Sequence, residues 1–213
     1  EVVAEIEAAG GRAVVNGSDV TDFEQAGAMV AQAVDTFGRL DILVNNAGMV
    51  SVADDRALSG AVETVSYAEW QHSLRRNLDT AFLMSRAAVP VMRRGAWGRI
   101  VMVASVTGPV MAMRDDAAYA AAKAGMVGLT RSLAVDLADD GITANAVAPG
   151  WIATGSQTED ERREGEVTPL RRSGSADEVA WPAAWLCTPG AAYVTGQCLV
   201  VDGGNAVAEE RRV

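Results

Sequence analysis

The sequence predicts an α/β fold in which helices cover both faces of a mostly parallel sheet. Short β-branched apolar runs alternate with longer segments of helical periodicity, as in repeated strand–helix units. Most of the short runs are apolar throughout, which is typical of strands that are buried on both faces. A chain of 213 residues with 49% hydrophobic content is long enough for one compact core, so we expect residues 1–213 to form a single domain.

The periodicity assigns the elements in chain order. The expected strands are Ala13–Val15, Leu40–Val44, Ile100–Ala104, Ile142–Val147 and Cys198–Val201. The expected helices are Val2–Ala8, Thr21–Phe37, Tyr67–Arg93, Ala117–Leu137 and Ala176–Leu186. Capping boxes are expected at Thr21–Glu24 and at Ser175–Glu178, and Gly10-Gly11 is expected to end the first helix.

The first residues are unusual for such a fold, because the sequence opens inside a helix and contains no GxGxxG turn. We therefore expect an N-terminally incomplete domain that lacks a strand, a turn, a helix and a second strand. From the size of a βαβ unit, this segment would comprise about 30 residues or more. Without it, the strand near Val15 lacks its neighbours, and much of the core edge should be exposed.

Charge and composition exclude several classes of function. A net charge of -10 and a pI of about 4.6 disfavour nucleic acid and anionic membranes as partners. Cys187 and Cys198 form no CxxC motif or Cys/His cluster, so neither a disulfide framework nor a zinc site is expected. No apolar run approaches the ~20 residues that cross a bilayer. We expect a cytoplasmic protein that acts on a small molecule.

The strongest candidate for chemistry is the pair Tyr119 and Lys123. The basic residues are almost all arginine, and Lys123 is the single lysine in the given sequence. Four positions separate it from Tyr119 on an expected helix, so both side chains project from one face. A nearby ammonium favours the phenolate form, which brings a tyrosine closer to proton transfer at neutral pH. On its own, the spacing is equally compatible with a core-edge tyrosine and a solvated lysine.

Further polar and small residues follow the carboxyl ends of the expected strands, where open α/β sheets bind ligands. Asn45-Asn46-Ala47-Gly48 would let a ribose approach the backbone, although an ordinary turn has the same composition. Ser105 is placed to donate to a substrate oxygen or to cap a helix. Asn77 lies inside an expected helix, although asparagine is a poor helix former. Pro149-Gly150 is compatible either with close approach of a flat ring to the backbone or with a plain turn.

Taken together and in this order, these motifs resemble the short-chain dehydrogenase/reductase family. The closing Thr195-Gly196-Gln197 and Val201-Asp202-Gly203-Gly204 extend the resemblance to essentially the whole chain. Within the family, Tyr119-Ala-Ala-Ala-Lys123-Ala-Gly, Asn145-Ala-Val-Ala-Pro149-Gly150 and Pro169-Leu-Arg-Arg172 are most similar to bacterial 3-oxoacyl-carrier-protein reductases. The resemblance implies a Rossmann-like doubly wound sheet, NAD or NADP as cofactor, and hydride transfer to or from a carbonyl or secondary alcohol.

The resemblance also implies roles for individual residues. Tyr119 would be the proton-transfer residue, Lys123 would lower its pKa and bind the nicotinamide ribose, Ser105 would hold the substrate oxygen and Asn77 would position a water. Cofactor contacts would come from Asp19, Val20, Asn45, Ala47, Gly48, Pro149, Gly150, Ile152 and Thr154. The family's second strand selects NAD or NADP, so the choice is open here.

Three surface features bear on substrate and assembly. Met49–Ala68, which contains Asp54, Asp55 and Arg56, is expected to form either a lid over the site or a solvated loop. Thr154–Glu166 occupies the position of the family's substrate loop and is expected to close over the nicotinamide. Two helices carry apolar residues on more than one face, which favours a homodimer or homotetramer. These residues are Leu74, Leu78, Phe82, Met126, Leu129 and Leu133.

Two rival hypotheses remain. A non-catalytic scaffold that has lost cofactor binding would also retain these motifs. A metal-dependent dehydrogenase or hydrolase is disfavoured, because His72 is the only histidine and is expected on a helix surface.

Overall fold

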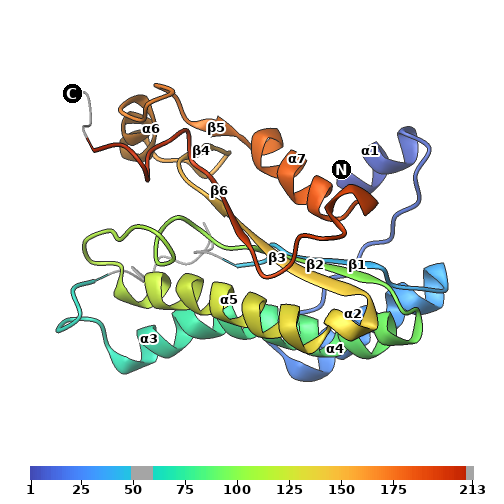
Figure 1. Cartoon of the computed structure of the whole chain (residues 1–213). Coiled ribbons are helices and arrows are strands. Elements are labelled where there is room, and N and C mark those ends of the chain that lie inside the picture. The colour runs from blue at the N-terminus through green and yellow to red at the C-terminus, as the bar shows by residue number, and fades with distance from the viewer. Residues whose placement is uncertain (49–59, 210–213) are drawn as a thin grey trace.

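The computed structural model describes residues 1–48 and 60–209. Its centre is a four-stranded parallel sheet in the order β1–β2–β3–β6. Helices α2, α4 and α5 lie on one face of this sheet and α7 lies on the other (Figure 1). The predicted Rossmann-like α/β class is therefore confirmed.

The strands and helices have the following bounds. The main sheet contains β1 (Ile42–Asn45), β2 (Gly98–Val103), β3 (Ile142–Pro149) and β6 (Cys198–Val201), and a small second sheet pairs β4 (Ile152–Ala153) with β5 (Gly174–Ser175). The helices are α1 (Val2–Ala8), α2 (Phe23–Phe37), α3 (Tyr67–Leu74), α4 (Thr80–Arg94), α5 (Ala117–Asp136), α6 (Glu159–Glu166) and α7 (Ala176–Leu186). A π-helical turn, Arg75–Asp79, joins α3 to α4, and short 3-10 turns occupy Ala138–Asp140 and Pro189–Ala191.

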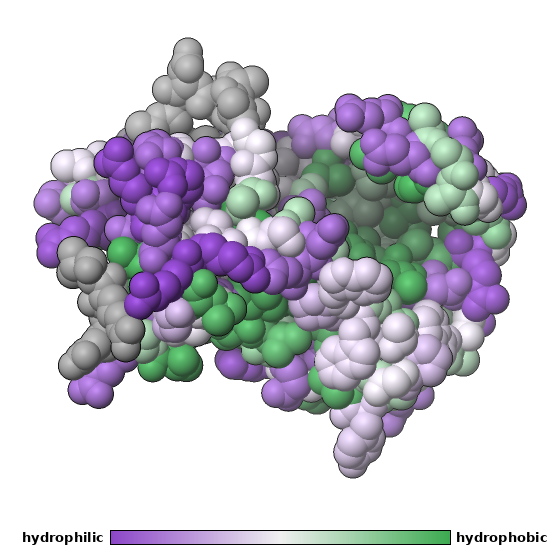
Figure 2. Space-filling model, turned by 90° about the horizontal axis from the view of Figure 1, so that it is seen from above, coloured by the Kyte–Doolittle hydropathy of each residue, from purple (hydrophilic) through white to green (hydrophobic). Residues whose placement is uncertain are grey.

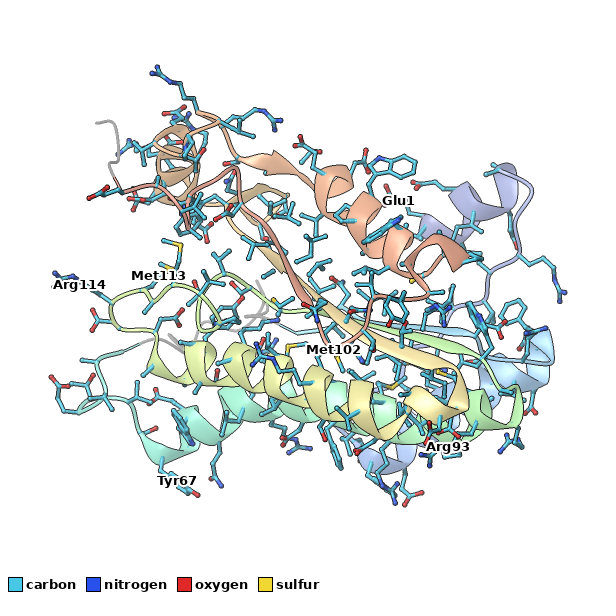
Figure 3. All side chains as sticks on the ribbon, in the orientation of Figure 1. Glu1, Tyr67, Arg93, Met102, Met113 and Arg114 are labelled. Atoms are coloured by element: carbon cyan, nitrogen blue, oxygen red, sulfur yellow. The ribbon has the colours of Figure 1, made fainter. Side chains whose placement is uncertain are left out.

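Two apolar layers hold the sheet in place. Ile100 and Met102 of β2 are buried against the α4 and α5 side, whereas Val101 packs with Leu186 of α7 on the opposite side. Residues 142–148 of β3 are all buried. Figure 3 shows Met102 in the interior between the sheet and the helix layer. Burial on both faces explains why the sequence pattern of these strands is apolar throughout.

The expected strand Ala13–Val15 is not formed. Val14 and Val15 are 43% and 72% exposed, and no strand among the described residues pairs with this segment. A strand is stable only when its backbone groups find a neighbouring ladder, and apolar character alone does not provide one.

β1 stands at the edge of the sheet, and its apolar side chains are partly open to solvent. Ile42 is 42% exposed and Val44 is 46% exposed. Figure 2 shows a hollowed, largely apolar area on the upper face of the molecule. The expectation of an exposed core edge is met for these two residues of β1.

Other local predictions have mixed outcomes. Thr21 does not cap α2, because the carboxylate of Asp22 accepts the Gln25 N–H at 2.9 Å instead. The capping box at Ser175 is confirmed at the start of α7. The expected helix Tyr67–Arg93 is formed as a continuous helical run, but it contains a π-helical turn, in which each backbone bond spans one residue more than in an α-helix.

The segment Thr154–Glu166 contains a helix that the sequence pattern did not predict. Thr158 caps α6 by accepting the Glu161 N–H, and the Glu161 carboxylate bonds back to the Thr158 N–H. Ion pairs between Arg162 and both Glu159 and Glu166 lie along the same helix. The expectation for Asp54, Asp55 and Arg56 lies outside the described residues.

Candidate active site

The candidate site lies where the carboxyl ends of β1, β2 and β3 meet the first turns of α5. The parallel register brings Asn45 of β1 beside Met102 of β2, and Val103 of β2 beside Val147 of β3. Ser105 follows β2, and Pro149 ends β3. Ligands bind at this edge in open parallel sheets.

Tyr119 and Lys123 share one buried face of α5. The Lys123 Nζ lies 5.6 Å from the centroid of the Tyr119 ring and donates a hydrogen bond to the Val103 carbonyl at 3.0 Å. Lys123 is 3% exposed, and burial lowers its pKa to about 8. No carboxylate among the described residues forms an ion pair with this ammonium. The site therefore holds a desolvated, readily titrated amine beside a phenol.

The pKa of Tyr119 differs from the sequence expectation. Burial raises the pKa of the phenol, a hydrogen bond with Ser105 acts in the lowering direction, and the charge of Asp116 adds to the increase. Burial is the largest cause of this shift, and the Lys123 ammonium, 5.6 Å from the ring centroid, donates its hydrogen bond to the Val103 carbonyl rather than to the phenol. In this arrangement the phenol is held as a neutral proton donor.

Ser105 is placed between β2 and the Tyr119 hydroxyl. Its Oγ accepts the Thr107 N–H at 3.1 Å and also takes part in the hydrogen bond that lowers the Tyr119 pKa. The hydroxyl is thus oriented by the backbone and is directed at the phenol. Two hydroxyl groups at one point suit the binding of a single substrate oxygen.

Asn77 lies in the π-helical turn and is 3% exposed. Its Nδ2 donates to the Ser73 carbonyl at 3.2 Å, so the side chain is bonded to the irregular backbone of its own helix. A Cβ on Gly48 would lie 3.1 Å from the Asn77 Oδ1, which places the end of the Asn45–Gly48 turn directly against this side chain. Single π-helical turns are frequent at functional sites.

The side chain of Asn45 does not face the ligand edge. Its Nδ2 donates to the Ser85 Oγ and to the Met102 sulfur, both at 3.2 Å, and the residue is buried. Ala47 and Gly48 are exposed after the strand. Any contribution of Asn45 to nucleotide binding therefore comes through its backbone.

The remaining expected cofactor residues occupy two places. Asp19 and Val20 precede α2, where the Asp19 carboxylate accepts the Thr21 N–H at 2.8 Å and its pKa is lowered by that bond. Gly150 follows β3 and packs so closely on Asp202 that an added Cβ would lie 2.7 Å from the Asp202 Cβ. Pro149 is the last residue of β3. Ile152 lies in β4, and Thr154 lies in the loop that leads from β4 to α6.

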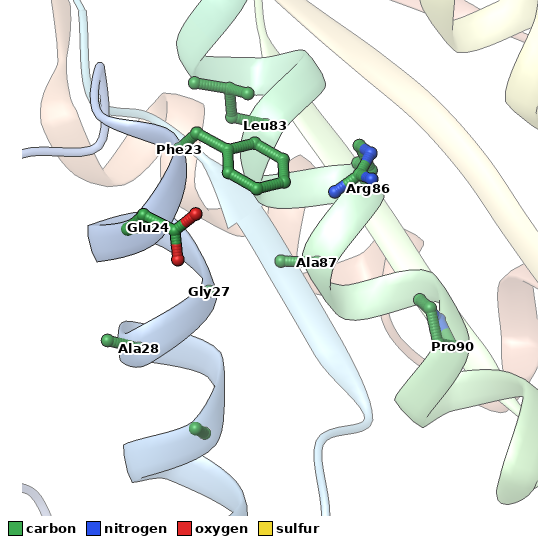
Figure 4. A pocket seen from close by; sticks show the side chains of 9 residues that line it. Phe23, Glu24, Gly27, Ala28, Leu83, Arg86, Ala87 and Pro90 are labelled. Carbon is green, nitrogen blue, oxygen red and sulfur yellow. The ribbon is translucent and has the colours of Figure 1, made fainter.

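Two surface hollows lie elsewhere. One, of about 500 Å³, opens between α2 and α4, where Phe23 stacks under the Arg86 guanidinium at 4.5 Å (Figure 4). Another is lined by Arg39, Asp41, Ile42 and Trp97 at the amino ends of β1 and β2. Neither contains any expected site residue, so the assignment of the site rests on its side-chain geometry.

Two features of the site were not expected from the sequence. Gly108 has a φ of +100° and approaches α5 so closely that a Cβ would lie 2.1 Å from the Ala120 carbonyl oxygen. Asp116, three residues before Tyr119, is half-buried and its pKa is raised to about 6 by that burial. A carboxylate three residues before the tyrosine was visible in the sequence, whereas the Gly108 contact had no sequence signal.

Within residues 1–48 and 60–209, no group of His, Cys, Asp and Glu side chains is arranged to hold a metal ion. The Nε2 atom of His72 lies 3.5 Å from the Nη1 atom of Arg76. None of the helices in these ranges has the length and apolar character needed to span a membrane.

Known proteins are similar to this chain in sequence and in fold. A family model described as enoyl-(acyl carrier protein) reductase matches residues 1–206. A 3-oxoacyl-[acyl-carrier-protein] reductase from Synechocystis sp. is 41% identical over 206 residues, which are 95% of this chain and 80% of that protein. Trans-4-hydroxycyclohexanecarboxylate dehydrogenase from Sinomonas cyclohexanicum is 37% identical over 91% of this chain and 71% of its own length.

The crystal structure of acetoin dehydrogenase YohF from Salmonella typhimurium superposes with a TM-score of 0.86 and 34% sequence identity, covering 99% of this chain and 82% of that one. Agreement in both sequence and fold is unambiguous at this level. The chain belongs to the short-chain dehydrogenase/reductase family and is an NAD(P)-dependent oxidoreductase of carbonyl and alcohol groups.

Proposed function

We propose that this enzyme interconverts a ketone and a secondary alcohol at the strand-end site, with Tyr119 as its proton-transfer residue. The observation that carries the proposal is the grouping of the Tyr119 hydroxyl, the Ser105 hydroxyl and the Lys123 ammonium at one ligand edge. A substrate oxygen that meets both hydroxyl groups is held by Ser105 and protonated by Tyr119 during reduction. In oxidation the phenolate form of Tyr119 accepts the alcohol proton.

The Lys123 ammonium is suited to donate hydrogen bonds to two neighbouring hydroxyl groups of a sugar. Its ammonium has three donors, and only one hydrogen bond, to the Val103 carbonyl, is made by the described residues. The remaining donors match the two ribose hydroxyls of a nicotinamide nucleotide, and those contacts would relieve the desolvation that lowers the pKa of Lys123. NAD or NADP, when bound, supplies or accepts the hydride.

We assign the other cofactor contacts by position. Asp19 and Val20 would flank the adenine, and Ala47, Gly48 and the backbone of Asn45 would line the adenosine side. Pro149, Gly150, Ile152 and Thr154 would surround the nicotinamide. Asn77, buried in its π-helical turn against Gly48, would hold a water that returns a proton to Tyr119 through Lys123.

The substrate class follows from what the relatives share. The names of the relatives include 3-oxoacyl-[acyl-carrier-protein], trans-4-hydroxycyclohexanecarboxylate and acetoin, and each of these compounds carries a ketone or a secondary alcohol. We propose a 3-oxoacyl compound or a small ketone for this enzyme.

The test is the substitution Tyr119→Phe, assayed with a panel of ketones and alcohols and both cofactors. Removal of the hydroxyl should lower kcat/KM by about 10²- to 10⁴-fold while nucleotide affinity, measured by fluorescence titration, stays unchanged. Tyr67→Phe is the matched control, because Tyr67 is 74% exposed at the start of α3. Substantial turnover by Tyr119→Phe would refute the assigned role. A protein that binds neither nucleotide would instead support the non-catalytic scaffold.

We also propose that α4 and α5 pair with a second copy of the chain. Phe82 of α4 is 49% exposed, and Val135 of α5 is 79% exposed. Both helices belong to the layer on one face of the sheet (Figure 1). Met126, one of the residues expected on this face, is 1% exposed and belongs to the core instead. A monomeric mass in light scattering would contradict the proposed homodimer or homotetramer.

A further inference from the structure

Asp116 has a carboxyl group that the fold does not use. It occupies the cap position at the start of α5, yet its side chain makes no capping hydrogen bond. Asp22, in the same position before α2, accepts the Gln25 N–H at 2.9 Å. Among the described residues, none forms a hydrogen bond or ion pair with the Asp116 carboxyl, and only burial shifts its pKa.

The backbone around Asp116 is firmly placed. Asp115 adopts the left-handed conformation with a φ of +58°, and its carbonyl accepts the Gly60 N–H at 2.5 Å. Asp116 forms a β-bridge with Gly60, and its carbonyl accepts the Ala120 N–H at 3.0 Å. The left-handed conformation is uncommon outside glycine, although aspartate adopts it more readily than most residues. The backbone that carries the carboxyl group is therefore held in place, and none of the described residues bonds to the carboxyl oxygen atoms.

This carboxyl group is close to the reacting centre. Asp116 is the cap residue of α5 and Tyr119 is the third residue of that helix, so both belong to its first turn. The pKa of Tyr119 is raised mainly by burial, and the charges of Asp116 and of Glu161 on α6 act in the same direction. Figure 1 places α6 at the same end of the molecule as the first turn of α5. A half-buried carboxylate without a donor is unfavourable, because desolvation is not offset by a hydrogen bond. A substrate that supplies a donor at this point removes that penalty.

We propose that Asp116 is a substrate-binding residue that bonds to a hydroxyl group on the carbon next to the reacting carbonyl, so that the enzyme prefers hydroxyketones and vicinal diols. The inference rests on the proposed function, since it takes Tyr119 to mark the position of the carbonyl oxygen. A hydroxyl suits the carboxyl group in both protonation states, because it can donate to the carboxylate or accept from the acid. A site with a buried polar group rejects substrates that leave that group unpaired.

The test compares two ketones of equal shape, hydroxyacetone and butanone, in which a methyl group replaces the hydroxyl. The wild-type kcat/KM should be higher for hydroxyacetone. In Asp116→Ala the ratio of the two kcat/KM values should fall by about 10- to 100-fold, as expected for a hydrogen bond to a charged group. Asp116→Asn, which keeps an acceptor, should give an intermediate ratio.

Asp115→Asn is the matched control. Its carboxyl is exposed one residue away, and asparagine tolerates the left-handed conformation, so the ratio should equal that of the wild type. An unchanged ratio in Asp116→Ala would overturn the proposal. A preference for aminoacetone over hydroxyacetone that disappears in Asp116→Ala would overturn the hydroxyl assignment in favour of a cation.

A binding measurement separates this inference from the proposed function. Saturation-transfer NMR with propylene glycol and sec-butanol reports binding without turnover. Stronger binding of the diol by the wild type, lost in Asp116→Ala, supports the inference even if no ketone is reduced. Equal binding of the two alcohols by the wild type overturns it even if Tyr119 proves to be the proton-transfer residue.

Discussion

Replacing Lys123 by methionine removes an ammonium whose charged form is destabilised by burial in the folded protein. The pKa of this group falls from 10.5 to about 8 on burial. At ~1.4 kcal/mol for each pH unit, this corresponds to about 3 kcal/mol of penalty for keeping the charge in the folded state. Methionine fills a similar volume without charge, but it leaves the Val103 carbonyl without its donor, which costs about 1–3 kcal/mol at every pH.

The sign of the pH dependence follows from proton binding. Between pH 8 and 10.5 the unfolded state holds more protons on Lys123 than the folded state, so wild-type stability rises with pH across this window. Below pH 8 the lysine is charged in both states, and the full penalty applies. The penalty is therefore about 3 kcal/mol at pH 7 and about 1 kcal/mol at pH 9.5.

Urea unfolding of both proteins without nucleotide, at pH 7 and pH 9.5, measures this difference. The wild type should gain about 2 kcal/mol relative to Lys123→Met between the two pH values, because the lost carbonyl bond cancels in the comparison. Activity of Lys123→Met should be lost at both. A stability difference that does not change with pH would show that Lys123 is not desolvated and would refute the reasoning.

Three further predictions concern separate parts of the structure. Gly108→Ala should destabilise the fold by about 3 kcal/mol or more in urea unfolding, because the added Cβ would overlap the Ala120 carbonyl. Its control is Gly128→Ala in α5, where an added Cβ would face open space and should stabilise the fold by about 0.5–1 kcal/mol. Equal effects of the two substitutions on stability would contradict the close approach of Gly108 to α5. Asn77→Ala should lower kcat by about 10-fold or more with a smaller change in KM, and an unaltered kcat would remove Asn77 from the proton relay. Ser175→Ala should lower stability by about 1 kcal/mol through loss of the α7 capping box without affecting steady-state kinetics.

Elements with local signals were predicted best from the sequence. The bounds of α1, α7 and β6 agree with the expected Val2–Ala8, Ala176–Leu186 and Cys198–Val201. Apolar periodicity marks these elements, a capping box marks the start of α7, and the Gly10-Gly11 turn follows α1 within a few residues. The α6 helix had a comparable signal, since Thr158 and Glu161 form a capping box, but its lack of apolar residues concealed it.

Elements that depend on distant partners were predicted less well. Val14 and Val15 have strand composition, yet no ladder is available to them among the described residues. The π-helical turn around Asn77 leaves no periodic trace, although a poor helix former at that position was a correct indication of irregularity. In the site, the Tyr119–Lys123 pairing followed from helical spacing, but the direction of the phenol's pKa shift did not, because desolvation depends on the whole surrounding fold.

A solitary lysine that is almost completely buried has a practical consequence for chemical labelling. Besides any terminal amine, reagents that acylate amines have one side chain to find in this sequence, and at about pH 8 half of that amine is in its nucleophilic, uncharged form. The rate of acylation at Lys123 would then report how often the ligand edge opens, and a dinucleotide that covers the edge would slow it. Mass spectrometry of one peptide could follow occupancy of the enzyme without any catalytic assay.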